Sequence, residues 1–214
     1  MSPKSTRLYL VRHAQTAWNA EGRFQGQSDV PLSQAGVDDC LEARSAVQGL
    51  DLTAAYSSPL SRAKDTASSI LHNQDIELHF RPDLMEINLG DLEGVYATEA
   101  REDFPEVLKQ WKEAPSKVQM PKGESLRDVQ SRVAQCIGRI IEDNVGGNVL
   151  IVAHGFALLS FVCHVLELPL DNFRHLHLDH LGLTQVEILP ERTVLRRFNV
   201  QLSENTFSKN KLPA

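Results

Sequence analysis

Two apolar segments of the sequence each lead to a histidine. Residues 8–11 are followed by Arg12 and His13, and residues 149–153 are followed by His154. An unbroken apolar run of this length is typical of a buried strand in a parallel sheet. Parallel strands carry the residues that follow them at the same edge of the sheet, so the pattern predicts that both imidazole rings lie at one edge.

A third predicted strand, at residues 54–56, leads into a helix whose first turn carries Arg62. The N-terminus of a helix presents unpaired N–H groups and a partial positive charge. The planar guanidinium group of an arginine can hold two phosphate oxygens at once. Two arginines, two histidines and the helix N-termini therefore predict an anion site, and phosphate is the anion that fits this set best.

The segments that must position these groups alternate between strands and helices. Ser33 predicts the N-cap of one helix, and Ser125 with Asp128 predicts a capping box at the start of another. Apolar residues recur at helical spacing over residues 63–71 and 126–140. The expected strands are 8–11, 54–56, 149–153, 183–188 and 194–199, and the expected helices are 33–48, 63–71, 126–140 and 156–166.

This alternation predicts the α/β class, as a three-layer α/β/α sandwich with a mostly parallel sheet. Ligands of such sheets bind at the carboxyl ends of the strands, near a switch in strand order. The sequence contains no internal repeat and no break in composition, so we expect a single domain over residues 1–214. Three prolines interrupt residues 91–123, which we expect to form an irregular lid or specificity segment, and the polar residues 203–214 are expected to fray.

The composition excludes several classes of partner. The chain has 22 Lys and Arg against 28 Asp and Glu, for a formal charge of −6, and lacks the basic stripe of a nucleic-acid-binding protein. The most apolar stretch, residues 156–166, is too short to cross a bilayer, and residues 1–7 lack the apolar region of a signal peptide. Three widely spaced cysteines favour free thiols, so we expect a cytoplasmic protein without a membrane partner.

Four ordered motifs resemble the signature of the histidine phosphatase superfamily, which includes the cofactor-dependent phosphoglycerate mutases. The segment 10–16 reads Leu-Val-Arg-His-Ala-Gln-Thr, and segments 23–26 and 29–33 continue the likeness. Ala14 stands where most members of the family have glycine. The other motifs are Ser57-Ser58-Pro59-Leu60-Ser61-Arg62-Ala63, the acidic segment from Glu86 to Gly94, and Val152-Ala153-His154-Gly155, so that the resemblance spans roughly residues 7–155.

The resemblance implies a covalent mechanism. His13 would attack phosphorus and form a phosphohistidine, and Glu86 would protonate the leaving oxygen and then deprotonate the attacking water. Arg12, Arg62 and His154 would hold the phosphoryl oxygens, which leaves no need for a metal or another cofactor. The substrate-binding residues that the resemblance implies are Asn19, Gln25, Gly26 and Gly155.

Two groups of residues leave alternatives open. Glu93 competes with Glu86 for the role of acid, although Glu93 is better placed to cap or orient a helix start near Tyr96. The histidine-rich segment 173–180 places His175 and His177 on one face of a strand, where they could chelate zinc. The alternative, which we favour, is a solvated face before the next strand.

The family contains both mutases and phosphatases. Its mutases carry a longer insertion between Glu93 and Gly123, with paired arginines that retain a bisphosphorylated intermediate, whereas this chain is short there and has only scattered basic residues. We therefore expect a phosphatase for a small phosphorylated metabolite, acting as a monomer or a homodimer. The alternatives are a cofactor-dependent phosphoglycerate mutase and a non-catalytic protein that binds a phosphorylated ligand.

Overall fold

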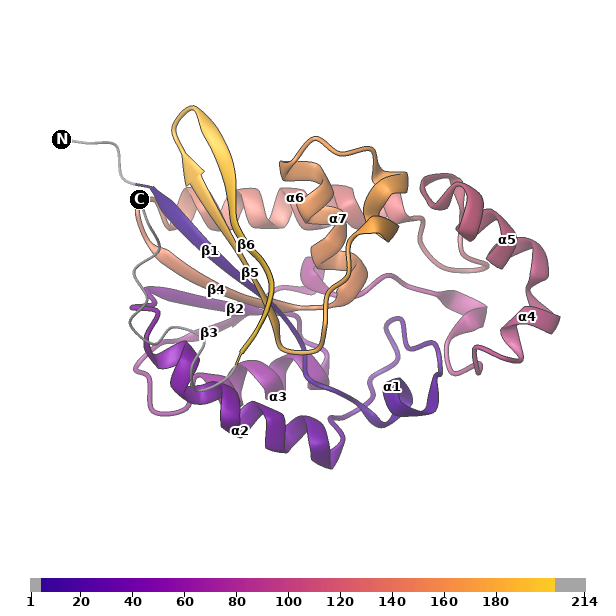
Figure 1. Ribbon diagram of the computed structural model, residues 1–214, viewed down its shortest axis with the longest axis horizontal. Helices are drawn as coiled ribbons and strands as arrows, with labels where there is room; N and C mark the ends of the chain where they lie inside the picture. The colour runs from indigo at the N-terminus through magenta and orange to yellow at the C-terminus, as the bar shows by residue number, and fades with distance from the viewer. Residues whose placement is uncertain (1–4, 203–214) are drawn as a thin grey trace.

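The computed structural model describes residues 5–202, so the expected fraying of residues 203–214 lies outside the described residues. Six strands form one sheet in the order β3-β2-β4-β1-β5-β6 (Figure 1). β1 to β4 run parallel, and β5 and β6 join antiparallel at one edge. The strands are β1 (Thr6–Arg12), β2 (Ala54–Ser57), β3 (Leu78–Phe80), β4 (Asn148–Ala153), β5 (Gly182–Leu189) and β6 (Arg192–Gln201).

Helices cover both faces of this sheet, so the expected three-layer fold is confirmed. In Figure 1, α2 and α3 lie below the sheet, α6 and α7 lie above it, and α4 and α5 lie to the right of the main body. The α-helices are α1 (Ala17–Glu21), α2 (Gln34–Gln48), α3 (Ser61–Ile70), α4 (Ala100–Asp103), α5 (Pro105–Glu113), α6 (Leu126–Asp143) and α7 (Gly155–Val165). The 3-10 helices are η1 (Pro82–Leu84), η2 (Gly90–Leu92), η3 (Pro115–Lys117) and η4 (Leu170–His175).

The apolar run of β1 follows from its central place in the sheet. Leu8 and Leu10 pack in the core against α6 and α7, while Tyr9 and Val11 pack in the core against α2 and α3. Because successive side chains of a strand point to opposite faces, a strand covered on both sides needs apolar residues at every position. The histidine therefore follows directly after a fully buried strand.

The register of β1 and β4 brings the ends of these two strands together. Arg12 of β1 lies opposite Ala153 of β4, and the backbone N–H of His13 donates to the carbonyl of Ala153 at 2.9 Å. The chain leaves β1 toward α2 on one face and leaves β4 toward α7 on the other. This reversal is the switch point at which an open α/β sheet forms a crevice.

Local signals in the sequence located the long helices well. Ser33 caps α2, and Ser125 and Asp128 form the capping box of α6, as predicted. The short elements α1 and β3 were not predicted from the sequence. Residues 91–123 contain α4, α5 and η3 with no long helix, and α4 and α5 lie beyond the carboxyl ends of the parallel strands (Figure 1). No helix within residues 5–202 is both long and apolar enough to cross a membrane.

Two helical glycines allow a matched test of this packing. A Cβ atom at Gly36 of α2 would lie 2.2 Å from the carbonyl oxygen of Gln15, whereas a Cβ atom at Gly138 of α6 would meet nothing within 4 Å. We expect Gly36→Ala to lower the free energy of unfolding by about 1–3 kcal/mol through this clash. Gly138→Ala should raise it by roughly 0.5–1 kcal/mol, because alanine favours the helix. Urea titration of both variants measures the difference, and equal effects would contradict the packing described.

Candidate active site

The two histidines predicted to meet do so at the carboxyl ends of β1 and β4. The ring centroids of His13 and His154 are 5.1 Å apart, and both side chains are buried. Nδ1 of His13 lies 2.7 Å from the carbonyl oxygen of Ala14, which places the ring proton on Nδ1. The lone pair of Nε2 is therefore available as a nucleophile.

Burial and two neighbouring cations keep the nucleophile uncharged. Desolvation, followed by the charges of Arg62 and Arg12, lowers the pKa of His13 well below its usual value. Desolvation and Arg62 also lower the pKa of His154 in the same way. Both rings are therefore neutral near pH 7, and the His13 ring does not have to lose a proton before it attacks.

The second histidine is oriented by a serine. Nε2 of His154 lies 2.8 Å from the hydroxyl of Ser58, and the same hydroxyl accepts the backbone N–H of Leu60. The hydroxyl of Ser58 can therefore donate its proton to Nε2 of His154. The ring proton of His154 is then on Nδ1. Nδ1 is buried and has no protein partner among residues 5–202, which suits a donor to a bound anion.

Backbone carbonyls hold the two arginines. The guanidinium of Arg62 donates to the carbonyls of Gly26 at 2.7 Å and Ser28 at 2.8 Å, and that of Arg12 donates to the carbonyl of Leu178 at 2.6 Å. Nε of each arginine is buried and has no partner within the described residues. Each guanidinium is thus fixed on one side and keeps an N–H group for a ligand.

The carboxylate of Glu86 lies against the N-terminus of α7. Its Oε2 accepts the backbone N–H of Phe156 at 3.1 Å, and its Oε1 accepts those of Ala157 at 3.2 Å and Ile87 at 2.9 Å. These three bonds fix the carboxyl group beside the arginines. Oε2 has the fewer partners and is the oxygen better placed to exchange a proton with a substrate.

Glu93 has a different role, because it supports the loop beneath Arg62. Its Oε1 accepts the backbone N–H groups of Gln27 at 2.8 Å and Leu89 at 3.1 Å, and its Oε2 accepts the hydroxyl of Ser28 at 2.6 Å. A Cβ atom at Gly26, whose φ is 56°, would lie 2.2 Å from Oε1 of Glu93. This close approach explains why the loop has glycine there.

The expected capping role of Glu93 near Tyr96 is therefore wrong. The carboxylate that accepts the backbone N–H of Tyr96 belongs instead to Glu99, at 3.3 Å. The sequence distance from Glu93 to Tyr96 suggested a local cap, but the carboxylate reaches back across the chain to residues 27 and 28.

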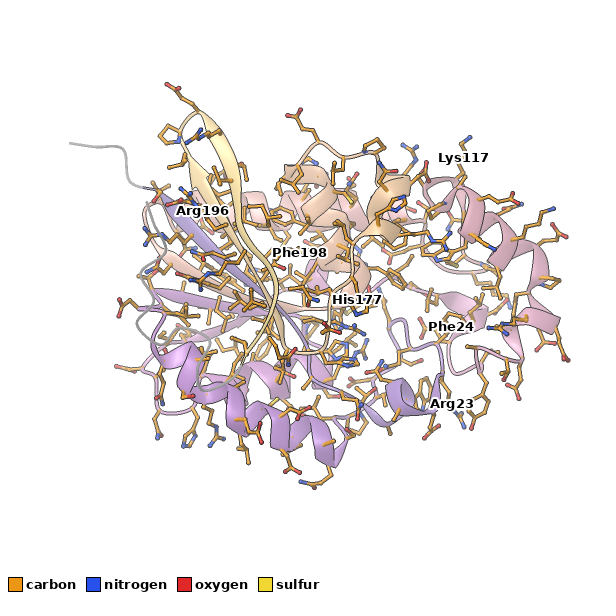
Figure 2. The ribbon with its side chains drawn as sticks, viewed as in Figure 1. Arg23, Phe24, Lys117, His177, Arg196 and Phe198 are labelled. Carbon is orange, nitrogen blue, oxygen red and sulfur yellow. The ribbon has the colours of Figure 1, made fainter. Side chains whose placement is uncertain are left out.

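A cavity of about 150 Å³ lies between these groups. Figure 2 shows Arg23 and Phe24 on the side of the site nearest α1, and His177 on the side nearest α7. The ring of His154 lies 5.1 Å from that of His13 but is not among the residues that line this cavity, and Gly155 lines an adjoining cavity. The residues that line the first cavity are Arg12, His13, Asn19, Arg23, Phe24, Gln25, Gly26, Arg62, Glu86, Leu89 and Phe156.

Asn19 presents its amide to this cavity because its oxygen is already engaged. The side-chain oxygen accepts the backbone N–H of Thr16 at 3.1 Å and the hydroxyl of Thr16 at 2.9 Å, and together these groups cap α1. The amide NH2 group remains as a donor. The short helix α1, which the sequence pattern did not predict, therefore orients one of the predicted binding residues.

His180 also lies at the site, although the sequence pattern did not predict it there. Its ring centroid lies 5.8 Å from that of His13, and burial together with Arg12 lowers the pKa of His180 to about 4. His177, in contrast, is exposed and bonds to Asp179 at 2.8 Å. Within residues 5–202, no group of three or more His, Cys, Asp or Glu side chains is arranged to hold a metal ion. Only the fold brings His180 to the site, since it is 167 positions from His13 in the printed sequence.

The fold and the site define an α/β protein with a cationic, histidine-containing anion site at its topological switch point. The sequence matches the histidine phosphatase superfamily (branch 1) over residues 8–201, and the chain belongs to this family. The match covers all the residues predicted to form the site.

Relatives in this family include both phosphatases and mutases. The chain is 30% identical to phosphoserine phosphatase 1 of Hydrogenobacter thermophilus, over 91% of this chain and 92% of the relative. It is 33% identical to a probable phosphoglycerate mutase, GpmB, of Salmonella arizonae, over 84% of each chain. Among solved structures, YhfR of Bacillus stearothermophilus superposes with a TM-score of 0.88 at 30% identity, over 93% of this chain and 98% of that one. This chain is a histidine phosphatase, which is a phosphoric monoester hydrolase.

The lowered pKa of His180 predicts a pH dependence of stability. An unfolded histidine titrates near pH 6.5, while folded His180 titrates near pH 4. Between these values the unfolded chain binds more protons than the folded chain, so the free energy of unfolding rises with pH across this window. His180→Gln should lower the slope of the unfolding free energy against pH, by up to the amount that corresponds to about one proton. Urea titrations at several pH values from 4.5 to 6.5 measure the slope, and an unchanged slope would rule out the buried, neutral His180.

Proposed function

We propose that the protein hydrolyses a small phosphate monoester, without a metal, through a phosphohistidine formed on His13. The observation that carries this proposal is the state of the His13 ring. Its Nδ1 is fixed to the Ala14 carbonyl, its lowered pKa keeps it neutral, and it lines a cavity between Arg12 and Arg62. A neutral, oriented imidazole beside two guanidinium groups suits attack on a phosphate dianion.

In the first step, Nε2 of His13 forms a bond to phosphorus while the bond from phosphorus to the ester oxygen breaks. Glu86, in its protonated form, gives its proton to the leaving oxygen. Arg12, Arg62 and His154 donate to the phosphoryl oxygens, where charge must be stabilised during the transfer. The products of this step are the free alcohol and the phosphorylated ring.

In the second step, a water molecule attacks phosphorus from the side that the alcohol has left. Glu86, now a carboxylate, takes a proton from this water, and the bond from phosphorus to Nε2 of His13 breaks. Phosphate leaves, and the protonated Glu86 is restored for the next turnover. Asn19, Gln25, Gly26 and Gly155 are proposed to bind substrate around this centre, and the first three of them line the cavity.

Hydrolysis is favoured over mutase activity by the segment 94–123. A mutase must retain a bisphosphorylated intermediate, which requires cations close to the phosphoryl site. The basic residues of this fully described segment do not line the phosphate cavity, and Lys122 pairs with Asp91 at 2.9 Å. All five of them are exposed: Arg101, Lys109, Lys112, Lys117 and Lys122. Water can therefore compete for the phosphohistidine.

We also propose a partner, an oligomeric state and a cellular location for the enzyme. The partner is a small phosphorylated metabolite rather than a nucleic acid or a membrane, and the protein acts as a monomer or a homodimer in the cytoplasm. The three buried cysteines support a reducing compartment, since all are free thiols. Burial raises the pKa of Cys40 to about 11, so this thiol is unreactive near neutral pH.

Phosphate release from a panel of small esters in EDTA tests the reaction directly. We expect turnover that survives EDTA, and a loss of at least about a thousandfold in kcat for His13→Ala, because the variant lacks the nucleophile. The control is His72→Ala, an exposed histidine far along the chain from the site, which should keep full activity. Loss of turnover in EDTA, or an active His13→Ala variant, would overturn the proposal. Interconversion of 2- and 3-phosphoglycerate faster than phosphate release would favour the mutase.

A pair of glutamine variants assigns the acid. Glu86→Gln should lower kcat by about 10²–10⁴ for an alkyl phosphate, whose leaving alkoxide needs a proton. The loss should be much smaller for p-nitrophenyl phosphate, because its leaving phenolate is already stable. In Glu93→Gln the amide oxygen can still accept from Gln27 and Leu89, so both substrates should lose the same factor, below about tenfold. The opposite dependence on the leaving group would assign the acid to Glu93.

A further inference from the structure

A second cavity adjoins the phosphate cavity and is lined mainly by apolar side chains. It has a volume of about 260 Å³ and shares Arg12, Glu86 and Phe156 with the phosphate cavity. The two spaces therefore meet at the carboxylate proposed as the acid. The apolar lining consists of Phe156, Leu159, Phe173, Leu176 and Leu178.

The reaction geometry aims the alcohol of the substrate at this second cavity. His13 lines only the phosphate cavity, whereas Glu86 lines both. In an in-line displacement the leaving oxygen lies opposite the nucleophile and must reach the acid. The organic part of the substrate then continues past Glu86, away from His13. We propose that the second cavity binds the leaving group, and that the enzyme acts on phosphate esters of apolar, ring-bearing alcohols; this inference rests on the proposed phosphatase function.

Packed aromatic rings form part of the wall of the second cavity. The rings of Phe156, Phe173 and Trp111 pack edge-to-face, with centroids 5.5–5.7 Å apart. Trp111 belongs to α5, so the segment between the acidic motif and α6 supports the wall from outside. An apolar cavity of about 150 Å³ can hold a benzene ring, so this one has room for a ring with substituents. Edge-to-face packing also suits an additional aromatic ring.

The described residues that line the second cavity offer no favourable ion pair to a charged leaving group. Of its two charged lining residues, Arg12 is directed to the phosphate and the Leu178 carbonyl, and Glu86 would repel a carboxylate. His177 lines the cavity as well, but its side chain is exposed and bonds to Asp179. A carboxylate or ammonium group on the alcohol would lose water here without gaining an ion pair.

Arg23 also lines the phosphate cavity, but its charge is already engaged. Its guanidinium pairs with Glu21 at 2.8 Å and lies 4.0 Å from the centroid of the Tyr96 ring. It also lies 5.7 Å from the centroid of the Trp18 ring. An acidic leaving group would have to compete with these contacts, whereas the apolar cavity is open to a ring.

The test compares 2-phenylethyl phosphate with ethyl phosphate, which share the same ester bond and differ only in the ring. We expect kcat/KM to be roughly ten- to a hundredfold higher for the phenylethyl ester, because its ring is buried in the apolar cavity. Two variants of half-buried Leu176 should reduce this ratio at least threefold: Leu176→Asn makes the wall polar, and Leu176→Trp fills the space. The control Leu168→Asn replaces a leucine that is 36% exposed and outside both cavities, and should leave the ratio unchanged.

Each outcome decides the proposal. A high ratio that falls in both Leu176 variants supports it, and so does hydrolysis of the phenylethyl ester alone. A ratio near one, or a high ratio that neither variant changes, overturns the leaving-group site while the phosphatase function stands, provided that phosphate release depends on His13. Absence of His13-dependent release from both esters and from the wider panel would overturn the phosphatase function, and the leaving-group site with it.

Discussion

Two buried guanidinium groups impose the main constraint on this structure. A cation removed from water is costly unless hydrogen-bond acceptors replace the lost solvent. The protein supplies backbone carbonyls: those of Gly26 and Ser28 hold Arg62, and that of Leu178 holds Arg12. Carbonyls stabilise the cations without neutralising them, so their charge is retained for an anionic ligand. The same charge, with burial, keeps the catalytic histidines neutral.

Much of the surrounding structure serves to hold these carbonyls and the nucleophile in place. Glu93 fixes the loop that carries the carbonyls for Arg62, and glycine at position 26 makes room for that carboxylate. The parallel register of β1 and β4 sets His13 beside His154. The carboxylate of Glu86 lies beside the cations, oriented by the backbone N–H of Ile87 and by two N–H groups at the N-terminus of α7. Phosphate chemistry and the adjoining apolar cavity thus meet at one carboxylate.

The sequence predicted the parts of the site that depend on local pattern. His13 and His154 follow apolar runs that only buried strands explain, and Ser33 and Ser125 mark helix starts by short-range hydrogen bonds. What the sequence could not show depends on distant contacts. The approach of His180 to the nucleophile follows from the position of β5, and two of the three partners of Glu93 lie about 65 positions earlier in the chain. Spacing along the chain carries no signal for either.

In the mechanism we propose, phosphate passes through a covalent bond to one ring nitrogen of His13. Rapid acid-free quenching of the enzyme with a ³²P-labelled ester, followed by peptide mapping, tests it most directly. We expect a labelled peptide that contains His13. Its label should be stable in alkali and lost in acid, and should form and decay at rates no slower than turnover. Label on another residue, or turnover without any labelled enzyme in both the parent protein and a Glu86→Gln variant that slows hydrolysis, would contradict it.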